Sequence, residues 1–421
     1  MIGQGSAGGA LASQVNIDKG LESYFKGSVD EVNYGGVRLQ PLSFQDDIAR
    51  AARGVKGALV GNIKMRSMME EKQLEVHPDK TGFIVLGSKK FKEDVEKELG
   101  ATPITFGNFV TGSKVMDKYL GDMIHADGLA ASVEATINDR AGKVQAAGFE
   151  VAAIIEDFRM QAVGGLMSAW DLWNMAIVPS LLSNCGIWTE IDTKSVQKLD
   201  EMQEAFIRRI MQVPISTPKV SLRSETGLLS MKLRIWGEKI KMVLAIRKMD
   251  KTFLARQIYE EQVRLQWPGL AREVEVICRA IGIPDVNQST VNKRDMDLDM
   301  AIQKVNREEI VMVMKDKYKK LDELVETENG LVKEYMKTKN ITESRMLFRI
   351  RTKMLDLKEN MKGRYKSNLE CDACDSQESE SQSHIMRCEG YKSLREGMDF
   401  SQDKDLVNYF SQVMQIRMAE K

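Results

Sequence analysis

Three of the five cysteines and one of the three histidines lie within eighteen positions near the carboxyl end of this 421-residue sequence. They form the pattern Cys371-x2-Cys374-x9-His384-x3-Cys388. Zn²⁺ favours a tetrahedral set of thiolate and imidazole ligands, and two close pairs of such residues suit that geometry. With four protein ligands, the sequence predicts a structural Zn²⁺ site. Chance clustering in a reduced chain is the alternative.

The segment between the two ligand pairs is polar, with the sequence DSQESESQS after Cys374. It cannot form a hydrophobic core, so we expect this part of the chain to depend on the metal for its order. The segment is also acidic, which argues against phosphate contacts by the zinc module itself. The remaining cysteines, Cys185 and Cys278, stand alone in apolar settings and are predicted to be small core side chains.

A second candidate for chemistry is the pair of adjacent carboxylates Asp46 and Asp47. The runs VRLQPLSF and IARAA flank them, and this pattern predicts a strand, a tight turn and a returning strand or helix. Neighbouring carboxylates repel each other, and Mg²⁺ commonly compensates such a pair. In two-metal phosphoryl transfer, carboxylates of this kind hold the ions. An exposed, solvated turn is the alternative, because Asp is common in turns.

Four motifs, in order, resemble those of a known enzyme family. Phe44-Gln45-Asp46-Asp47 resembles the aromatic-x-Asp-Asp motif of reverse transcriptases, and Gly3-Gln4-Gly5-Ser6 is similar to the family's Gln-Gly motif. The segment His77-Pro78-Asp79-Lys80-Thr81, followed by GFIVLG, is similar to the family's next palm motif. Lys118-Tyr119-Leu120-Gly121 is similar to the segment that precedes the primer-gripping hairpin. The chain thus resembles the carboxyl-terminal part of an RNA-directed DNA polymerase from a non-LTR (LINE-type) retrotransposon. The resemblance covers most of the chain.

The resemblance implies a role for individual residues. Asp46 would be a Mg²⁺ ligand and Asp47 its partner in the turn. Lys80 would donate a proton to pyrophosphate, and a solvated lysine is the alternative. The nucleotide and template pocket would be shaped by Gln4, Gly5 and Phe44. The implied partners are an RNA template and a DNA primer.

Reverse transcriptases carry a further catalytic aspartate, together with the fingers, upstream of the Gln-Gly motif. The sequence begins two residues before Gly3, so we expect that segment to be a missing amino-terminal partner from the same polyprotein. We therefore expect a truncated polymerase that does not polymerise DNA alone. One alternative is a non-enzymatic protein, derived from such an element, that binds nucleic acid or a partner. Another is a helical protein without a nucleic-acid role.

Charge gives a mixed indication about nucleic-acid binding. Sixty-one basic residues balance sixty-one acidic ones, whereas a dedicated nucleic-acid binder is usually basic. The best local excess lies between residues 341 and 370, where Arg345, Arg349 and Lys353 fall four apart and would share one helical face. We predict that these three contact a nucleic-acid backbone, with a solvated face as the alternative. Arg208 and Arg209, at a helix end, are weaker candidates.

Composition favours long helices, because Met is frequent and Pro is rare. The predicted fold is α+β, with five consecutive parts: a partial right-hand palm at 1–131, a helical thumb-like region at 132–250, a helical connector with the basic stripe at 251–366, a zinc knuckle-like module at 367–395 and a helical tail at 396–421. The apolar stretch 164–188 contains polar residues that would be costly in lipid. It is predicted to be buried helix with core tryptophans. No signal peptide is expected, and the predicted location is intracellular, in the nucleus or cytoplasm.

Overall fold

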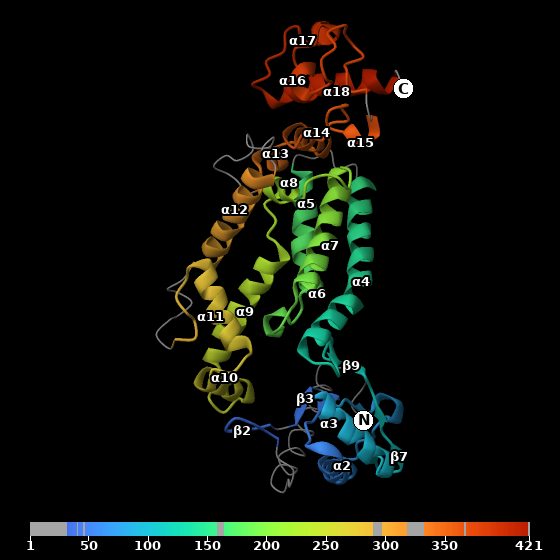
Figure 1. Cartoon of the computed structure of the whole chain (residues 1–421), viewed down its shortest axis with the longest axis vertical. Helices are drawn as coiled ribbons and strands as arrows, with labels where there is room; N and C mark the ends of the chain where they lie inside the picture. Colours follow the sequence, from blue (N-terminus) through green and yellow to red (C-terminus); the bar gives the residue numbers. More distant parts are fainter. Residues whose placement is uncertain are drawn as a thin grey trace. The chain divides into compact units, whose positions relative to one another are not determined.

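The computed structural model describes residues 32–39, 41–44, 47–157, 164–288, 297–317, 332–365 and 368–419. These residues are mostly helical with a few small sheets (Figure 1), which agrees with the α+β expectation at that level. The chain divides into two compact units, each drawn from three stretches that are distant in sequence. Unit 1 takes Met1–Asp139, Asn184–Ser195 and Trp236–Met296, and unit 2 takes Arg140–Ser183, Val196–Ile235 and Asp297–Lys421.

The strands are short and confined to the first third of the chain among the described residues. They are β1 (Asn33–Tyr34), β2 (Val37–Arg38), β3 (Leu42–Phe44), β4 (Asp47–Ala49), β5 (Gly82–Phe83), β6 (Thr105–Phe106), β7 (Phe109–Val110), β8 (Gly112–Ser113), β9 (Met116–Tyr119) and β10 (Asp122–His125). They pair two by two, and only β5 and β8 run parallel. Where the structure is described, no continuous sheet of the kind expected for a polymerase palm is formed.

Most of the other described residues are helical. They are α2 (Gly54–Glu71), α3 (Lys89–Ala101), α4 (Leu129–Asp157), α5 (Gly165–Leu172), α6 (Val178–Leu181), α7 (Thr193–Met211), α8 (Lys219–Thr226), α9 (Met231–Lys248), α10 (Leu254–Leu265), α11 (Leu270–Ile281), α12 (Leu298–Lys317), α13 (Glu334–Thr338), α14 (Ile341–Arg351), α15 (Lys362–Tyr365), α16 (Gln382–Ile385), α17 (Lys392–Arg395) and α18 (Asp403–Ala419). Single-turn 3₁₀ helices occur at η1 (Pro78–Lys80), η3 (Cys185–Ile187) and η6 (Glu389–Tyr391), and a π-helical turn at η2 (Trp173–Ile177).

In unit 1, the predicted strand–turn–strand around the carboxylate pair is confirmed as a hairpin. β3 and β4 pair antiparallel, with Phe44 opposite Asp47. Ile48 of β4 packs against Met65 and Met68 of α2. After β4, the guanidinium of Arg50 donates to backbone oxygens of α2, including that of Ala58 at 2.8 Å. The hairpin is therefore fixed on helix α2.

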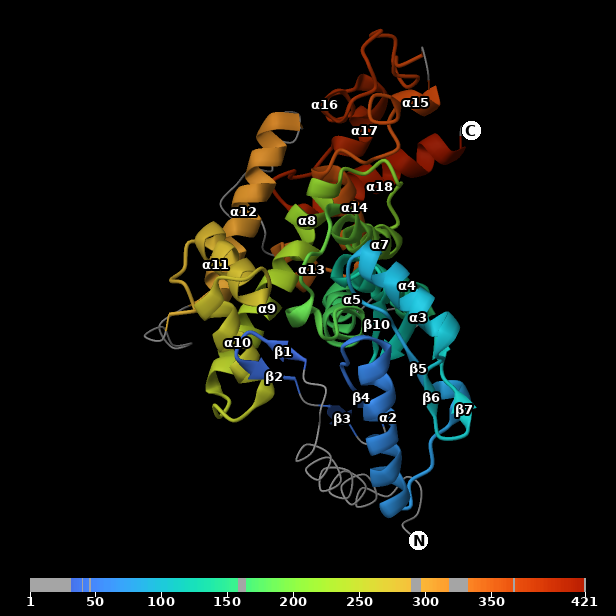
Figure 2. The same cartoon turned by 60° about the horizontal axis from the view of Figure 1, so that its bottom comes forward.

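The rest of unit 1 includes α10 and α11, and the β1–β2 hairpin lies against α10 (Figure 2). The backbone N–H of Gly36 donates to Glu261 Oε2 at 3.0 Å, and the ring of Tyr34 meets Trp267 edge to face. Gly35, between these strands, has φ +60°, a left-handed conformation that glycine adopts at no steric cost. A glycine turn thus brings β1 and β2 onto a helix far along the sequence.

Unit 2 is a helical assembly built on amphipathic α7. Leu199, Phe206 and Ile210 are buried, and their spacings of seven and four positions place them on one face of the helix. The indole of Trp173 stacks on the Phe206 ring with centroids 4.4 Å apart. Trp173 and Trp170 are both 1% exposed, which confirms them as core residues. Among the described residues, no helix is long and apolar enough to span a membrane.

The carboxyl-terminal part of unit 2 has a hydrophobic core of its own. This core, called the tail core below, joins α14, α18 and the cysteine segment, and its buried members are Ile350, Leu355, Leu357, Cys371, Ile385, Cys388, Tyr391, Tyr409, Phe410 and Val413. The predicted zinc module (367–395) and helical tail (396–421) therefore share one core rather than folding apart. The last described helix, α18, covers the cysteine segment.

Candidate metal centre

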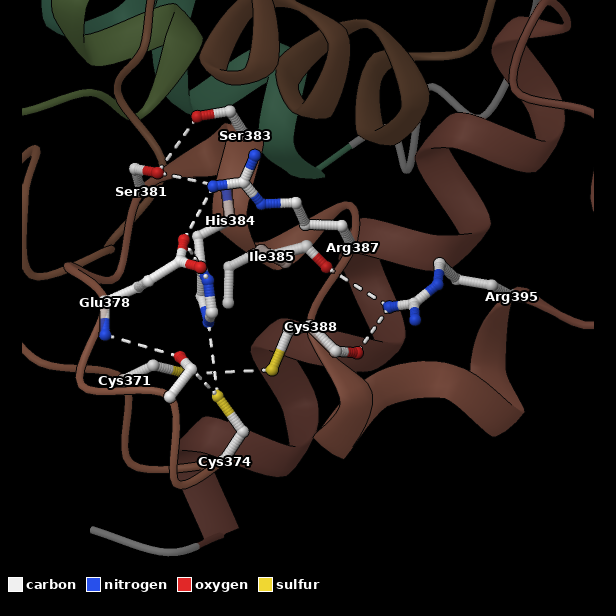
Figure 3. A network of polar contacts seen from close by, with 11 residues as sticks. Cys371, Cys374, Glu378, Ser381, Ser383, His384, Ile385, Arg387, Cys388 and Arg395 are labelled. Carbon is white, nitrogen blue, oxygen red and sulfur yellow. Dashed lines mark hydrogen bonds and ion pairs between the residues drawn. The ribbon is translucent and has the colours of Figure 1, made fainter.

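The four predicted zinc ligands converge in space. The Sγ atoms of the three cysteines and a ring nitrogen of His384 all lie within 4.8 Å of one another (Figure 3). Cys371 Sγ and Cys388 Sγ are 3.8 Å apart, and Cys374 Sγ lies 3.4 Å from His384 Nε2. A tetrahedron with Zn–S near 2.3 Å and Zn–N near 2.0–2.1 Å needs separations of about 3.8 and 3.5 Å. The cluster could therefore hold a metal ion such as zinc.

Two short backbone devices bring the ligand pairs together. An isolated bridge joins Glu370 to Ser379, and the N–H of Cys371 donates to the Glu378 oxygen at 2.9 Å. This folds the polar insertion back on itself. Helix α16 then begins at Gln382, and Ser381 Oγ accepts from the N–H of His384 at 3.0 Å as its cap. The cap fixes the turn from which His384 faces the cysteines.

Glu378 orients the histidine from the side opposite the cysteines. Its Oε2 lies 3.1 Å from His384 Nδ1 and accepts from Arg387 at 2.6 Å. A carboxylate at Nδ1 leaves Nε2 as the metal-binding nitrogen, and such partners typically support metal-bound histidines. Hydrogen bonds from Arg387 and then His384 lower the pKa of Glu378, so it stays a carboxylate. The acidic insertion therefore serves the metal cluster itself.

Each cysteine of the cluster accepts a hydrogen bond from the backbone N–H of the residue two positions later in the sequence. Burial raises the pKa of the Cys371 thiol to about 12, and the N–H of Ala373 opposes this. Burial likewise raises the pKa of Cys388, with Gly390 N–H opposing. Hydrogen bonds from the side chain and backbone of Ser376 lower the pKa of Cys374 to about 6. Each donor stands two residues after its cysteine and stabilises the thiolate form that binds metals.

The tail core holds this cluster in place. His384 is 3% exposed and Cys388 2%. Tyr409 of α18 donates its hydroxyl to the Ile385 oxygen, and Arg395 donates to the Cys388 oxygen at 2.6 Å. Both bonds tie the second ligand pair to other parts of the core. Hydrophobic packing therefore also supports this segment, and its dependence on the metal stays a prediction.

Gly390 is the closest steric constraint at the cluster. A Cβ at this position would lie 1.9 Å from the backbone oxygen of Ala373, between the two cysteines of the first pair. We expect Gly390→Ala to force the ligand pairs apart, to cost at least the 1–3 kcal/mol typical of overpacking, and to weaken zinc binding. Competition with a fluorescent zinc chelator measures the affinity.

Gly363 in α15 is the matched control for that substitution. A Cβ there would meet nothing within 4 Å. Gly363→Ala should leave zinc affinity unchanged and stabilise the fold by about 0.4–1 kcal/mol. Equal zinc affinities for the two alanine variants would show that the close approach at Gly390 does not position the ligands.

The predicted polymerase residues are described only in part. Gln4, Gly5 and Asp46 lie outside the described residues, as does the side chain of Phe44. Asp47 is exposed at the start of β4. Burial raises the pKa of Tyr119, and the negative charge of Asp47 raises it further, so residues of two of the four motifs interact electrostatically. Lys80 is exposed in η1.

Two arginines of the predicted basic stripe donate hydrogen bonds to other residues of unit 2. Arg345 Nε donates to the Ile210 oxygen and an Arg349 Nη to the Gln212 oxygen, each at 2.7 Å. Both arginines thus cap the carboxyl end of α7, where positive charge is favourable. The expected helical face was wrong for Lys353, because α14 ends at Arg351 and Lys353 has φ +57° in the turn beyond it. Contact with a nucleic-acid backbone stays a prediction for all three.

Comparisons with models of protein families, with curated proteins and with solved structures found no match to this chain. The functional argument therefore rests on the residues and their geometry.

Sequence reasoning missed the residues that support the cluster. Glu378, Arg387 and Gly390 carry no distinctive spacing, and Glu378 was noted only as part of an acidic insertion. One signal was available: a glutamate followed six residues later by a ligand histidine can reach the histidine's second nitrogen if the intervening chain turns. The sequence does not show whether the chain turns there; in the structure, the bridge between Glu370 and Ser379 forms that turn.

Proposed function

We propose that this chain is the carboxyl-terminal part of an RNA-directed DNA polymerase of the non-LTR type. The observation that supports this most is the hairpin at the aromatic-x-Asp-Asp motif. Phe44 pairs with Asp47 across the predicted turn, and Asp47 is electrostatically close to Tyr119 of the downstream motif. Motifs separated by about seventy residues would serve one site in such an enzyme, and a carboxylate exposed at a hairpin tip is open to a metal ion and a primer end.

In this proposal Asp46 and Asp47 hold Mg²⁺, which would supply charge stabilisation for the transferring phosphoryl group. Lys80 is the candidate proton donor. Unit 2 supplies the helical region that holds the template–primer duplex by contacts with the sugar–phosphate backbone. Its metal cluster is a structural Zn²⁺ site, because all four coordination positions are protein side chains and three of the four are buried.

A second candidate function is binding of nucleic acid without polymerisation. The observation that favours it is the tail core, which packs around a cluster that could hold a metal ion and includes neither Asp46 nor Asp47. Binding of this kind would fall steeply with salt and would not depend on Asp46 or Asp47.

The two functions differ in how binding responds to nucleotide. We expect the full chain to bind a labelled RNA template with a dideoxy-terminated DNA primer. Addition of Mg²⁺ and the complementary dNTP should tighten that binding about tenfold, or about 1.4 kcal/mol, because the carboxylates hold the metal-bound nucleotide. Asp46→Asn should abolish the tightening. Fluorescence anisotropy measures it without requiring turnover.

Asp94→Asn, an equal loss of charge on the exposed face of α3, is the control and should keep the nucleotide effect. Binding that is insensitive to dNTP in all variants but falls steeply with salt would favour the second function. No binding to the template–primer at low salt would contradict both.

A further inference from the structure

Unit 1 contains a polar cavity that none of the sequence motifs accounts for. Its volume is about 460 Å³, and it lies among the end of α9, helix α10 and the segment that follows α11. The charged and polar residues that line it are Arg247, Arg256, Arg264, Glu260, Tyr259 and Asn287. Three arginines face one glutamate, so the lining carries a net positive charge.

Arg256 has donors to spare in this cavity. Its Nε donates to Glu260 Oε1 at 2.7 Å, and its side chain is 17% exposed. Within the described part of the chain, its Nη1 is buried without a hydrogen-bond partner. A buried donor left unsatisfied costs about 1–3 kcal/mol, and more when the group is charged. The guanidinium therefore has capacity for an acceptor that the described protein atoms do not supply.

Hydrogen bonds hold the segment after α11 in place beside the cavity. Tyr259 donates its hydroxyl to Asn287 Oδ1 at 3.0 Å, and Asn287 Nδ2 donates to the Ala271 oxygen at 2.9 Å. Arg247 donates to the Val286 oxygen at 2.5 Å. These bonds fix the segment after α11 over α10. The cavity is thus preorganised, which lowers the entropic cost of binding.

Charges around the cavity favour an anion. Arg264 is neutralised by a two-point contact with Glu261, at 3.0 and 2.6 Å, so its charge is already compensated. Burial raises the pKa of Tyr259 to about 12, and the charge of Asp285 raises it too, with the nearby Arg247 and Arg256 opposing, so the phenol adds no negative charge. Among the lining residues Arg247 and Arg256 outnumber the one carboxylate, Glu260. The Asp285 carboxylate lies nearby outside the lining and accepts from the Asn287 N–H at 3.0 Å.

We propose that this cavity binds an anion carrying a phosphate group, with Arg256 as its main ligand. The planar fork of a guanidinium matches phosphate oxygens at two points, and a second arginine, Arg247, also lines the cavity. The volume exceeds that of an isolated phosphate and falls within the 300–1,000 Å³ range typical of small-molecule pockets. The phosphate could belong to a free mononucleotide or to the end of a nucleic-acid strand.

The test uses the full chain without Mg²⁺ or template–primer, so its result is independent of the proposed polymerase function. AMP, inorganic phosphate and a short oligonucleotide with or without a 5′-phosphate are titrated by isothermal calorimetry. We expect saturable one-to-one binding of AMP, weakened at least tenfold by Arg256→Gln. The matched control is Arg279→Gln on α11. That arginine also pairs with a glutamate four residues away, at 2.9 Å, but is 74% exposed.

A second variant distinguishes a blocked cavity from a general loss of positive charge or of folding. Val263 lines the cavity, and Val263→Trp should fill the space and block AMP while keeping every arginine. Tighter binding of the 5′-phosphorylated oligonucleotide than of AMP, sensitive to the same two variants, would support the proposal with a strand end as the source. Absence of saturable binding by all phosphate probes, or binding indifferent to Arg256→Gln and Val263→Trp, would overturn it.

Discussion

Replacing Cys388 with serine should release the bound zinc and unfold the whole tail core, not only the metal loop. Cys388 is both a candidate ligand and a buried member of that core, at 2% exposure. Structural zinc in small modules contributes on the order of 10–16 kcal/mol of apparent binding free energy at neutral pH, which is also folding free energy. Losing one ligand should therefore remove more stability than the packing of α18 supplies. Zinc content by mass spectrometry and amide hydrogen exchange across residues 368–419 measure the two effects.

Cys278 provides the control for that substitution. It is a single buried cysteine in α11, 1% exposed and far in sequence from the cluster. Cys278→Ser should keep one zinc per chain and leave exchange in α18 unchanged. If Cys388→Ser retains stoichiometric zinc, or loses it with α18 still protected, the tail core does not depend on the metal.

The second large effect is expected at Glu225, a carboxylate without solvent exposure in α8. Its Oε2 accepts from the Tyr335 hydroxyl at 2.8 Å and from Arg351 Nε at 2.9 Å. The carboxylate thereby joins α8 to α13 and α14. Glu225→Ala removes the acceptor of a buried phenol and the charge opposite an arginine, so we expect a loss of about 3–5 kcal/mol in unfolding free energy.

Urea denaturation of the full chain measures this loss, with Glu275→Ala as the comparison. Glu275 also pairs with an arginine, but both side chains are exposed, at 37% and 74%. Such surface pairs contribute about 0–1 kcal/mol. Similar costs for the two alanine variants would mean that Glu225 does not organise the three helices.

Local patterns predicted the parts of the fold that local physics decides. The spacing of Leu199, Phe206 and Ile210 gives α7 its buried face. The spacing of the three cysteines and His384 near the carboxyl end correctly predicted that the four side chains converge. The hairpin at Asp47 followed from two short apolar runs about a turn. Each of these depends on residues that lie within eighteen positions of each other in the sequence.

What the sequence could not show depends on contacts between distant segments. Arg345 and Arg349 looked like a free basic face, because nothing local indicates that α7 ends beside them, some 135 positions earlier. Glu225 likewise gains its partners more than a hundred positions later. The cavity around Arg256 arises from three separate segments. Long charged side chains are as suited to capping a distant helix as to meeting a phosphate, so only the fold distinguishes the two uses.

Helix α14 has a consequence for how distant parts of unit 2 respond to one another. One of its ends contributes Ile350 to the tail core, while Arg345 and Arg349 cap α7 and Arg351 meets Glu225 of α8. Helix α14 therefore connects the metal cluster to the carboxyl end of α7. Thermodynamic reciprocity then requires that whatever zinc adds to the stability of the α7 end, an intact α7 end adds equally to the affinity for zinc.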